Sequence, residues 1–250
     1  MTLKYNDLKL GIVTPLANEK ETVEDFVQEV LAVCRSFEFK SIRFYVVLDL
    51  SSTDGTLDIL KKLSQHNQEL KIIFAPDNKN VVDAYKRGYY EAIADSVDWI
   101  LEMDGGFSHK PQEIPEFFET MIKGDYDCVF GSRFCTNGKI KKGSLKNILV
   151  SWGGTWVANL LLGTKLFDMT SGFELFKREA LVQILQKGVL SHGPFFQTEI
   201  RTFAHRFKII EVPIVYNAST GHVHRKAILD AFRNLYRLFL LRLKGELNSL

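Results

Sequence analysis

The first part of the chain alternates between short apolar runs and longer segments with apolar residues at helical spacing. The apolar runs are residues 8–14, 44–50, 70–75 and 98–103, and the segments between them are residues 21–37, 56–67 and 81–94. Short apolar runs are typical of buried strands, whereas apolar residues three and four positions apart indicate amphipathic helices. Because strands joined through helices pair in parallel, this order predicts an α/β fold with a mostly parallel central sheet and helices on both faces.

The second half of the chain has a less regular pattern. The expected strands are residues 126–131, 170–176 and 208–216, and the expected helices are residues 115–123, 149–162 and 177–187. Residues 139–146 are basic and contain glycine, so we expect a mobile loop there. Since no linker or repeat interrupts the pattern, we predict a single domain over residues 1–224, followed by a C-terminal helix over residues 225–250.

Charge and apolar content exclude several classes of protein. The 250 residues carry a net charge of +2, so we expect no general attraction to nucleic acid. No apolar run approaches the roughly 20 residues of a membrane-spanning helix, and the N-terminus lacks the apolar core of a signal peptide. The three cysteines have no metal-ligand spacing and cannot all form disulfides, which favours a reducing compartment. These features predict a cytoplasmic protein.

One expected strand ends in acidic residues that are followed by two glycines. Glu102 and Asp104 lie at this strand end, and Gly105 and Gly106 come next. Ligands of open α/β sheets bind beyond the carboxyl ends of the strands, and glycine lets the backbone approach a ligand closely. The segment therefore predicts a metal–phosphate or nucleotide site, with an acidic turn that binds nothing as the alternative.

Eight short motifs resemble, in order, those of the family 2 glycosyltransferases. They are Pro15-Leu-Ala-Asn-Glu19, Asp49-Leu-Ser-Ser-Thr-Asp-Gly-Thr56, Asn80 with Ala84 and Gly88, Asp104-Gly-Gly-Phe-Ser-His109, Gly131-Ser-Arg-Phe134, Thr170-Ser-Gly-Phe173, Phe196-Gln-Thr-Glu199 and Glu211-Val-Pro-Ile214. The nearest branch is the dolichol- and polyprenyl-phosphate mannosyltransferases, and the match covers about residues 8–215. The resemblance implies the GT-A fold, a nucleotide-binding α/β architecture.

The resemblance also implies an activity. We expect an inverting glycosyltransferase that moves a sugar from a GDP-sugar or UDP-sugar to a lipid-phosphate or saccharide acceptor, in cell-envelope polysaccharide or glycolipid synthesis. The alternative is a catalytically degenerate homologue that binds a nucleotide or a partner. Loss of several family residues favours that alternative, whereas retention of Asp104, Arg133 and Glu199 favours an active enzyme.

The motif positions give the expected site residues, except Lys226, which comes from a basic segment that departs from the family pattern and could replace its lost cations. Donor binding is assigned to Pro15, Ala17, Glu19, Asp49, Ser51, Asp83, Asp104, Gly105, Gly106 and Lys226. Asp104, Glu199 and Arg133 are the catalytic candidates. Glu199 would act as general base or position the acceptor, and Arg133 would contact the diphosphate. The alternatives are a solvated acid in the first turn of a helix for Glu199 and a surface salt bridge for Arg133.

A divalent cation, Mg²⁺ or Mn²⁺, is the expected cofactor, held by Asp104. The second acid of the family motif falls on Gly106, so the usual pair of carboxylates is absent. Glu102 is one substitute, because a regular strand places it on the same face as Asp104. A buried hydrogen-bonding role is its alternative. The remaining candidate ligands are His109, His222 and His224, for which a structural histidine and a solvated basic loop are the alternatives.

Residues 225–247 combine large apolar side chains with arginine and lysine at helical spacing. A basic amphipathic helix is typical of attachment to a membrane surface or to a partner helix. A terminal helix packed on its own domain is the other interpretation. Attachment to a membrane surface would give peripheral contact with the inner membrane surface.

Overall fold

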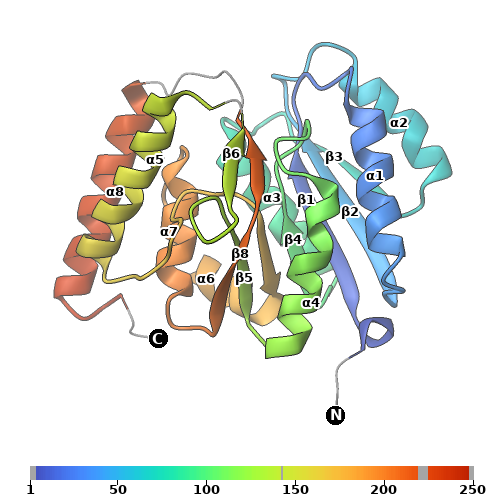
Figure 1. The fold of residues 1–250 in the computed structure, drawn as a ribbon. Helices are drawn as coiled ribbons and strands as arrows, with labels where there is room; N and C mark the ends of the chain where they lie inside the picture. Colours follow the sequence, from blue (N-terminus) through green and yellow to red (C-terminus); the bar gives the residue numbers. More distant parts are fainter. Residues whose placement is uncertain (1–3, 142, 219–224, 248–250) are drawn as a thin grey trace.

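In the computed structural model, which describes residues 4–141, 143–218 and 225–247, a sheet lies between two layers of helices (Figure 1). The strands of this sheet are β1 (Lys9–Pro15), β2 (Ser41–Leu48), β3 (Leu70–Phe74), β4 (Trp99–Glu102), β5 (Cys128–Ser132), β7 (Glu174–Lys177) and β8 (Ile209–Pro213). The helices are α1 (Val23–Arg35), α2 (Thr56–His66), α3 (Val81–Ala94), α4 (Ile114–Gly124), α5 (Leu145–Leu162), α6 (Arg178–Gln186), α7 (Phe195–Ala204) and α8 (Arg225–Leu243).

The strand order is β3-β2-β1-β4-β7-β5-β8. Strand β1 pairs in parallel with β2 and with β4, and β5 pairs in parallel with β8. Strand β7 runs antiparallel between β4 and β5. This arrangement confirms the predicted mostly parallel sheet, and it brings the carboxyl ends of β1, β2 and β4 to one edge.

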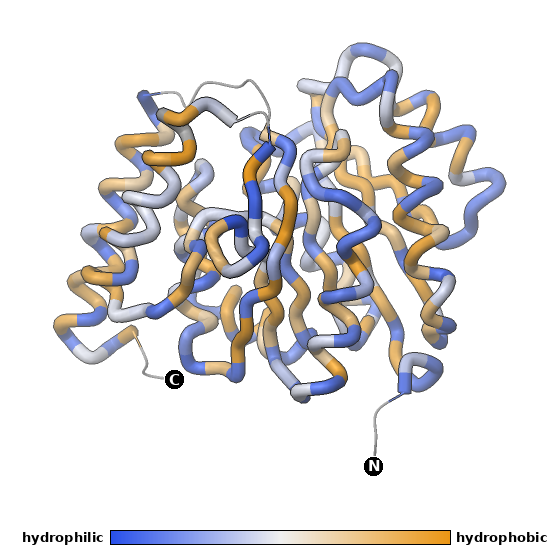
Figure 2. The backbone as a smooth tube through the Cα atoms, viewed as in Figure 1, coloured by the Kyte–Doolittle hydropathy of each residue, from blue (hydrophilic) through white to orange (hydrophobic). Residues whose placement is uncertain are grey.

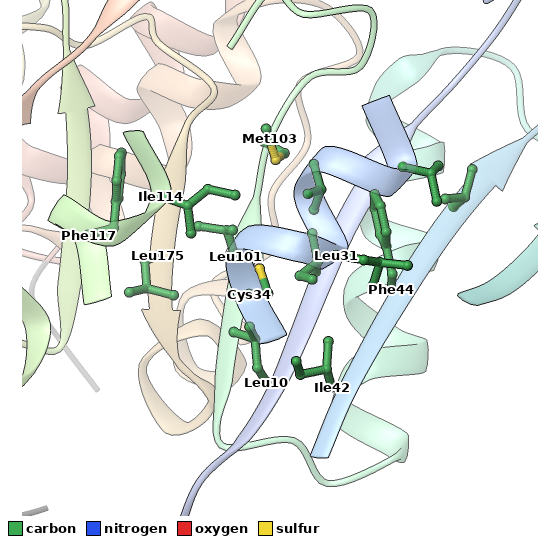
Figure 3. Close-up of a cluster of buried hydrophobic side chains, with 14 of the residues drawn as sticks. Leu10, Leu31, Cys34, Ile42, Phe44, Leu101, Met103, Ile114, Phe117 and Leu175 are labelled. Carbon is green, nitrogen blue, oxygen red and sulfur yellow. The ribbon is translucent and has the colours of Figure 1, made fainter. Parts of the chain in front are cut away.

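Two buried apolar clusters hold the helices against the sheet. The cluster on one face contains side chains of α1, α2 and α4, and Figure 3 shows Leu31 and Cys34 of α1 lying near Leu10 and Leu101 of the strands. The cluster on the other face contains side chains of α3, α5, α6, α7 and α8. Burial of apolar surface on both faces is the main stabilising contribution in such a three-layer fold.

Residues 139–146 differ from the expected mobile loop. Lys139–Lys141 form the short strand β6, which pairs in parallel with β9 (Val215–Asn217), and α5 begins at Leu145. The expected strand over residues 208–216 is divided, because the amide of Ile214 donates to Ser132 O and its carbonyl accepts from Lys139 N. Short 3₁₀ helices occupy Tyr5–Asp7 and Pro111–Glu113. The loop prediction was therefore wrong for residues 139–141, which form a strand, and for residues 145–146, which begin α5.

The C-terminal helix α8 packs on the domain instead of extending away from it. Figure 1 shows α5 and α8 side by side at one end of the molecule, and α8 also contacts α7. Asn234 and Leu238 are its buried residues. Among the described residues, no helix is both long enough and apolar enough to cross a bilayer.

Candidate active site

The loops after β1 and β2 are fastened to each other beyond the carboxyl ends of these strands. The Asn18 side chain donates to Ser51 O at 2.9 Å and accepts from Thr53 N at 2.9 Å. Asn18 has a φ of 58°, a left-handed conformation that asparagine adopts more readily than most residues. This residue was not among the predicted site residues, although it lies inside the first motif. It fixes the position of the neighbouring Glu19.

Asp104 lies beyond the end of β4, and two residues orient it. The Tyr85 hydroxyl, from α3, donates to Asp104 Oδ1. The backbone amide of Asp104 donates to Nδ1 of His109 at 3.0 Å. The Asp104 side chain is 38% exposed, so its carboxylate is fixed from the protein side and accessible from the other. Such an acid can receive a cation or a polar group of a ligand.

His109 is buried and serves the turn that follows Asp104. Its ring stacks on Phe173 at 4.9 Å and lies 5.3 Å from the Tyr216 ring. Burial lowers the pKa of His109 to about 4, so the ring is neutral at pH 7. Because Nδ1 accepts a backbone N–H, the proton lies on Nε2. These contacts match the structural interpretation of His109, in which it orients Asp104 from behind.

The two glycines after Asp104 lie against side chains of the β1–α1 loop. A Cβ on Gly105 would lie 2.0 Å from Leu16 Cδ2. Gly106 has a φ of +63°, and a Cβ on it would lie 2.5 Å from Oε1 of Glu19. The Glu19 carboxylate therefore occupies the space that a side chain at position 106 would need.

The other expected donor-side residues form local turns around this edge. Asp49 accepts from the amide of Ser51 at 2.8 Å and from its hydroxyl at 2.5 Å. Asp83 lies in the first turn of α3, where it accepts from Lys79 N at 3.0 Å. Pro15 ends β1 and Ala17 is exposed beyond it. These contacts are the ones expected of turn-forming residues. They do not test the predicted nucleotide-binding role of the same residues.

The remaining donor-side and metal candidates lie at or before the start of α8. Lys226 is exposed in the first turn of that helix. His222 and His224 lie outside the described residues.

Arg133 forms a buried ion pair. Its Nε lies 2.7 Å from Oδ2 of Asp168, and its NH2 lies 2.9 Å from Oδ1 and also donates to Thr170. Its guanidinium also lies 5.4 Å from the Tyr216 ring. This guanidinium holds the pKa of Asp168 at about 2, against the opposing effect of burial. Most of the Arg133 donors are therefore used within the protein. The surface salt bridge named as an alternative for Arg133 is therefore wrong, because this ion pair is buried. Asp168 was not among the predicted site residues.

Glu199 is fully buried in α7. Its carboxylate accepts from Leu190 N at 3.1 Å, from Ser191 N at 2.8 Å and from the Ser191 hydroxyl at 2.5 Å. It also pairs with Arg237 of α8. The alternative of a solvated helix acid is therefore wrong. Glu199 joins the segment before α7 to the C-terminal helix.

Glu102 is also fully buried, and its partner in the pairing of β4 with the neighbouring strand β7 is Glu174. Gln197 of α7 donates to its Oε1, and Arg201 pairs with Glu174 at 2.7 Å. Burial and the neighbouring Glu174 raise the pKa of Glu102 well above its usual value, and burial raises that of Glu174 to about 7. Because the two acids lie next to each other and beside one arginine, the protonation of one depends on that of the other. Glu102 thus has the buried hydrogen-bonding contacts proposed as its alternative.

The chain is similar in sequence to several known proteins. Residues 11–185 match the family described as Glycosyl transferase family 2. The undecaprenyl-phosphate mannosyltransferase of Micrococcus luteus is 28% identical over 173 residues, which cover 68% of this chain and 70% of that protein. The polyprenol monophosphomannose synthase of Mycolicibacterium smegmatis is 25% identical over 208 residues, which cover 82% of this chain and 76% of that protein.

Solved structures are similar in fold. Glucosyl-3-phosphoglycerate synthase from Mycobacterium tuberculosis in complex with UDP has a TM-score of 0.63 at 16% identity, covering 94% of this chain and 80% of that chain. The same enzyme with Mn²⁺ and UDP-glucose has a TM-score of 0.62 at 17% identity, with coverage of 94% and 78%. S. aureus TarS 1–349 with UDP has a TM-score of 0.63 at 14% identity, with coverage of 94% and 65%. These likenesses confirm the GT-A fold.

Proposed function

The chain belongs to glycosyltransferase family 2, and on that premise we propose that it is an inverting enzyme that moves a sugar from a nucleotide sugar to a polyprenyl phosphate. The relatives named above as acting on undecaprenyl phosphate and polyprenol support this acceptor. The comparisons give no support to a degenerate homologue without activity. The observation that carries the proposal is the partly exposed Asp104 beyond the end of β4, held in place by Tyr85 and His109.

Asp104 is the proposed donor-side acid. Within the described residues its Oδ2 accepts no hydrogen bond and lies 3.9 Å from Nδ1 of His109, so one oxygen is open to a ligand. Mg²⁺ and Mn²⁺ prefer such hard oxygen ligands. A bound cation would neutralise the diphosphate that leaves with the nucleotide. No group of three or more His, Cys, Asp or Glu side chains among the described residues could hold a metal. Donor phosphates would therefore complete the coordination.

The contacts of Glu199 support the proposed acceptor. A hydroxyl acceptor must lose a proton to a base as it attacks, whereas an ionised phosphate attacks without one. Both oxygens of Glu199 are already engaged by backbone amides, a hydroxyl and Arg237. We infer that Glu199 positions α7 and α8 around the acceptor side and removes no proton. An acceptor that is already ionised fits this arrangement.

Replacing Glu199 by glutamine is expected to reduce kcat by less than about 10-fold, because no proton transfer is lost; removal of a general base typically costs 10²–10⁴-fold. The melting temperature should fall by several degrees, since the amide cannot accept all of the present hydrogen bonds. Steady-state kinetics and thermal unfolding measure the two effects. A loss of activity above about 100-fold in a folded variant, with the pH profile losing its acid limb, would make Glu199 the base after all.

A polyprenyl-phosphate acceptor is embedded in a membrane, so the enzyme needs a surface that binds lipid. The paired helices α5 and α8 offer such a surface. Each carries a stripe of exposed apolar side chains spaced three or four residues apart, opposite its buried residues. The stripes are Leu145, Leu149, Trp152, Trp156 and Leu160 on α5, and Leu229, Phe232, Tyr236, Leu240 and Leu243 on α8. Figure 2 shows orange segments along both helices, with blue ones between them on α8. Arg233 and Lys244 lie beside the α8 stripe, which suits anionic lipid headgroups. We propose peripheral membrane contact through these stripes.

The double variant Trp152→Ser with Trp156→Ser is expected to bind anionic vesicles at least about 10-fold more weakly, because each tryptophan would bury a large apolar area in the interface. Co-sedimentation with vesicles that contain anionic lipid measures this loss. Tyr90→Ser is the matched control, since Tyr90 is an aromatic residue of similar exposure that lies on α3. Equal binding by the double variant and the control would place the membrane contact elsewhere or remove it.

The transfer reaction itself tests the function. The full chain is incubated with Mn²⁺, polyprenyl phosphate in vesicles and, in turn, a radiolabelled GDP-sugar or UDP-sugar. We expect label in the organic extract with one class of donor. Transfer only to a saccharide acceptor would refute the proposed acceptor, and no transfer together with no thermal shift by any nucleotide would refute the enzyme function.

A further inference from the structure

The carboxylate of Glu19 lies against Gly106, the position on which the second acid of the family motif falls. We propose that Glu19 and Asp104, from the loops after β1 and β4, form the carboxylate pair that holds the divalent cation in this protein. The inference rests on the proposed function and extends it to a residue that the motif does not assign as a metal ligand. Its basis is the geometry around Gly106.

Position 106 cannot carry a side chain while Glu19 stays where it is. A Cβ on Gly106 would lie 2.5 Å from Oε1, 2.7 Å from Oε2 and 2.8 Å from Cδ of Glu19. Contacts below 3.0 Å are essentially never seen for a real Cβ. An aspartate at position 106 would thus displace the flexible Glu19 side chain from its present position. The glycine that appeared as a missing ligand in the sequence is what allows a carboxylate from another loop to enter.

Glu19 is held in this position from several sides. Its amide donates to Oγ1 of Thr56 at 2.9 Å, and its Oε2 accepts from Oγ1 of Thr22 at 2.6 Å. Its carbonyl accepts from the amides of Thr22 and Val23 at the start of α1. Within the described residues, Oε1 accepts no hydrogen bond. Glu19 is therefore positioned in advance, with one oxygen open to a ligand.

The two acids complement a divalent cation in charge and chemistry. Each of Glu19 and Asp104 offers one open carboxylate oxygen, and Mg²⁺ or Mn²⁺ in nucleotide sites takes one or two carboxylates together with phosphate oxygens. Without a cation, two carboxylates next to the leaving diphosphate would repel it. If Glu19 served only to position the start of α1, its replacement would not change metal affinity.

Metal binding distinguishes these roles without any need for activity. Mn²⁺ bound to the full chain is measured by electron paramagnetic resonance with saturating UDP or GDP. Glu19→Gln is expected to lower the affinity for Mn²⁺ at least about 10-fold, because the charge of one ligand is lost. The double variant Glu19→Ala with Gly106→Asp should regain most of this affinity, since it empties the space beside position 106 and returns the carboxylate to the family position. Aspartate is one of the residues that tolerate a left-handed φ.

Gly106→Asp alone is the informative control. The new side chain would meet the Glu19 carboxylate, so this variant should have a lower melting temperature than the double variant. Unchanged Mn²⁺ affinity in Glu19→Gln, with nucleotide still bound, would overturn the inference and leave the proposed function intact. If the unaltered protein binds neither nucleotide nor Mn²⁺, the proposed function itself fails.

Discussion

Replacing Asp104 by asparagine is expected to slow sugar transfer about 1000-fold, because the variant loses the charge that holds the cation against the leaving diphosphate. Asparagine has nearly the same shape, and its carbonyl oxygen can still accept from the Tyr85 hydroxyl. The fold should therefore persist, with a melting temperature within a few degrees of the unaltered protein. The measurement is kcat at saturating donor, with vesicles containing polyprenyl phosphate.

Two companion variants separate charge from orientation. Tyr85→Phe removes the hydroxyl that orients Asp104, so we expect a smaller loss of about 10-fold. Asp77→Asn removes an exposed acid from the loop before α3 and should leave kcat unchanged. Should Asp104→Asn keep more than a tenth of the activity, Asp104 would not be the donor-side acid.

The fold was predicted well where local pattern determines structure. The helix expected over residues 81–94 has those bounds in the structure, and the strand expected over residues 98–103 became β4. Local periodicity fixes such elements, and the need for crossovers fixes parallel pairing. The antiparallel insertion of β7 between β4 and β5 depends on contacts far apart in sequence. The same is true of the pairing of residues 139–141 with β9, which local pattern did not reveal.

The sequence predicted where the site residues lie in the fold more accurately than which residues they contact. Arg133, Glu199 and Glu102 all stand in or next to family motifs. Their partners are Asp168, Arg237 and Gln197, at separations of 35, 38 and 95 residues. A motif identifies a residue type at a place in the fold, whereas the partner that engages it follows only from tertiary structure. Gly106 illustrates the same limit, since its neighbour Glu19 lies in the first motif of the chain.

Replacing Asp168 by asparagine is expected to cost about 3–5 kcal/mol of unfolding free energy, because it leaves the guanidinium of Arg133 buried without a counter-charge. The carboxylate is fully buried and accepts from the amide and two guanidinium nitrogens of Arg133, and from Thr170. Denaturant unfolding at pH 7 measures the loss. Asp125→Asn is the matched control, since Asp125 pairs with Lys177 at 2.7 Å but is 78% exposed, and exposed pairs contribute little to stability.

The pH dependence of the Asp168 effect gives a second test of the same ion pair. The pKa of Asp168 is about 2 in the folded protein, below its usual value of 3.8, so the unfolded chain binds this proton more readily. Its contribution to stability is therefore complete above about pH 4 and is lost as the pH falls toward 2. The difference in stability between the unaltered protein and Asp168→Asn should stay constant from pH 8 to pH 5 and shrink below pH 4. A difference that already shrinks between pH 7 and pH 5, or a loss at pH 7 no larger than that of Asp125→Asn, would contradict a buried ion pair that holds Arg133 beside the site.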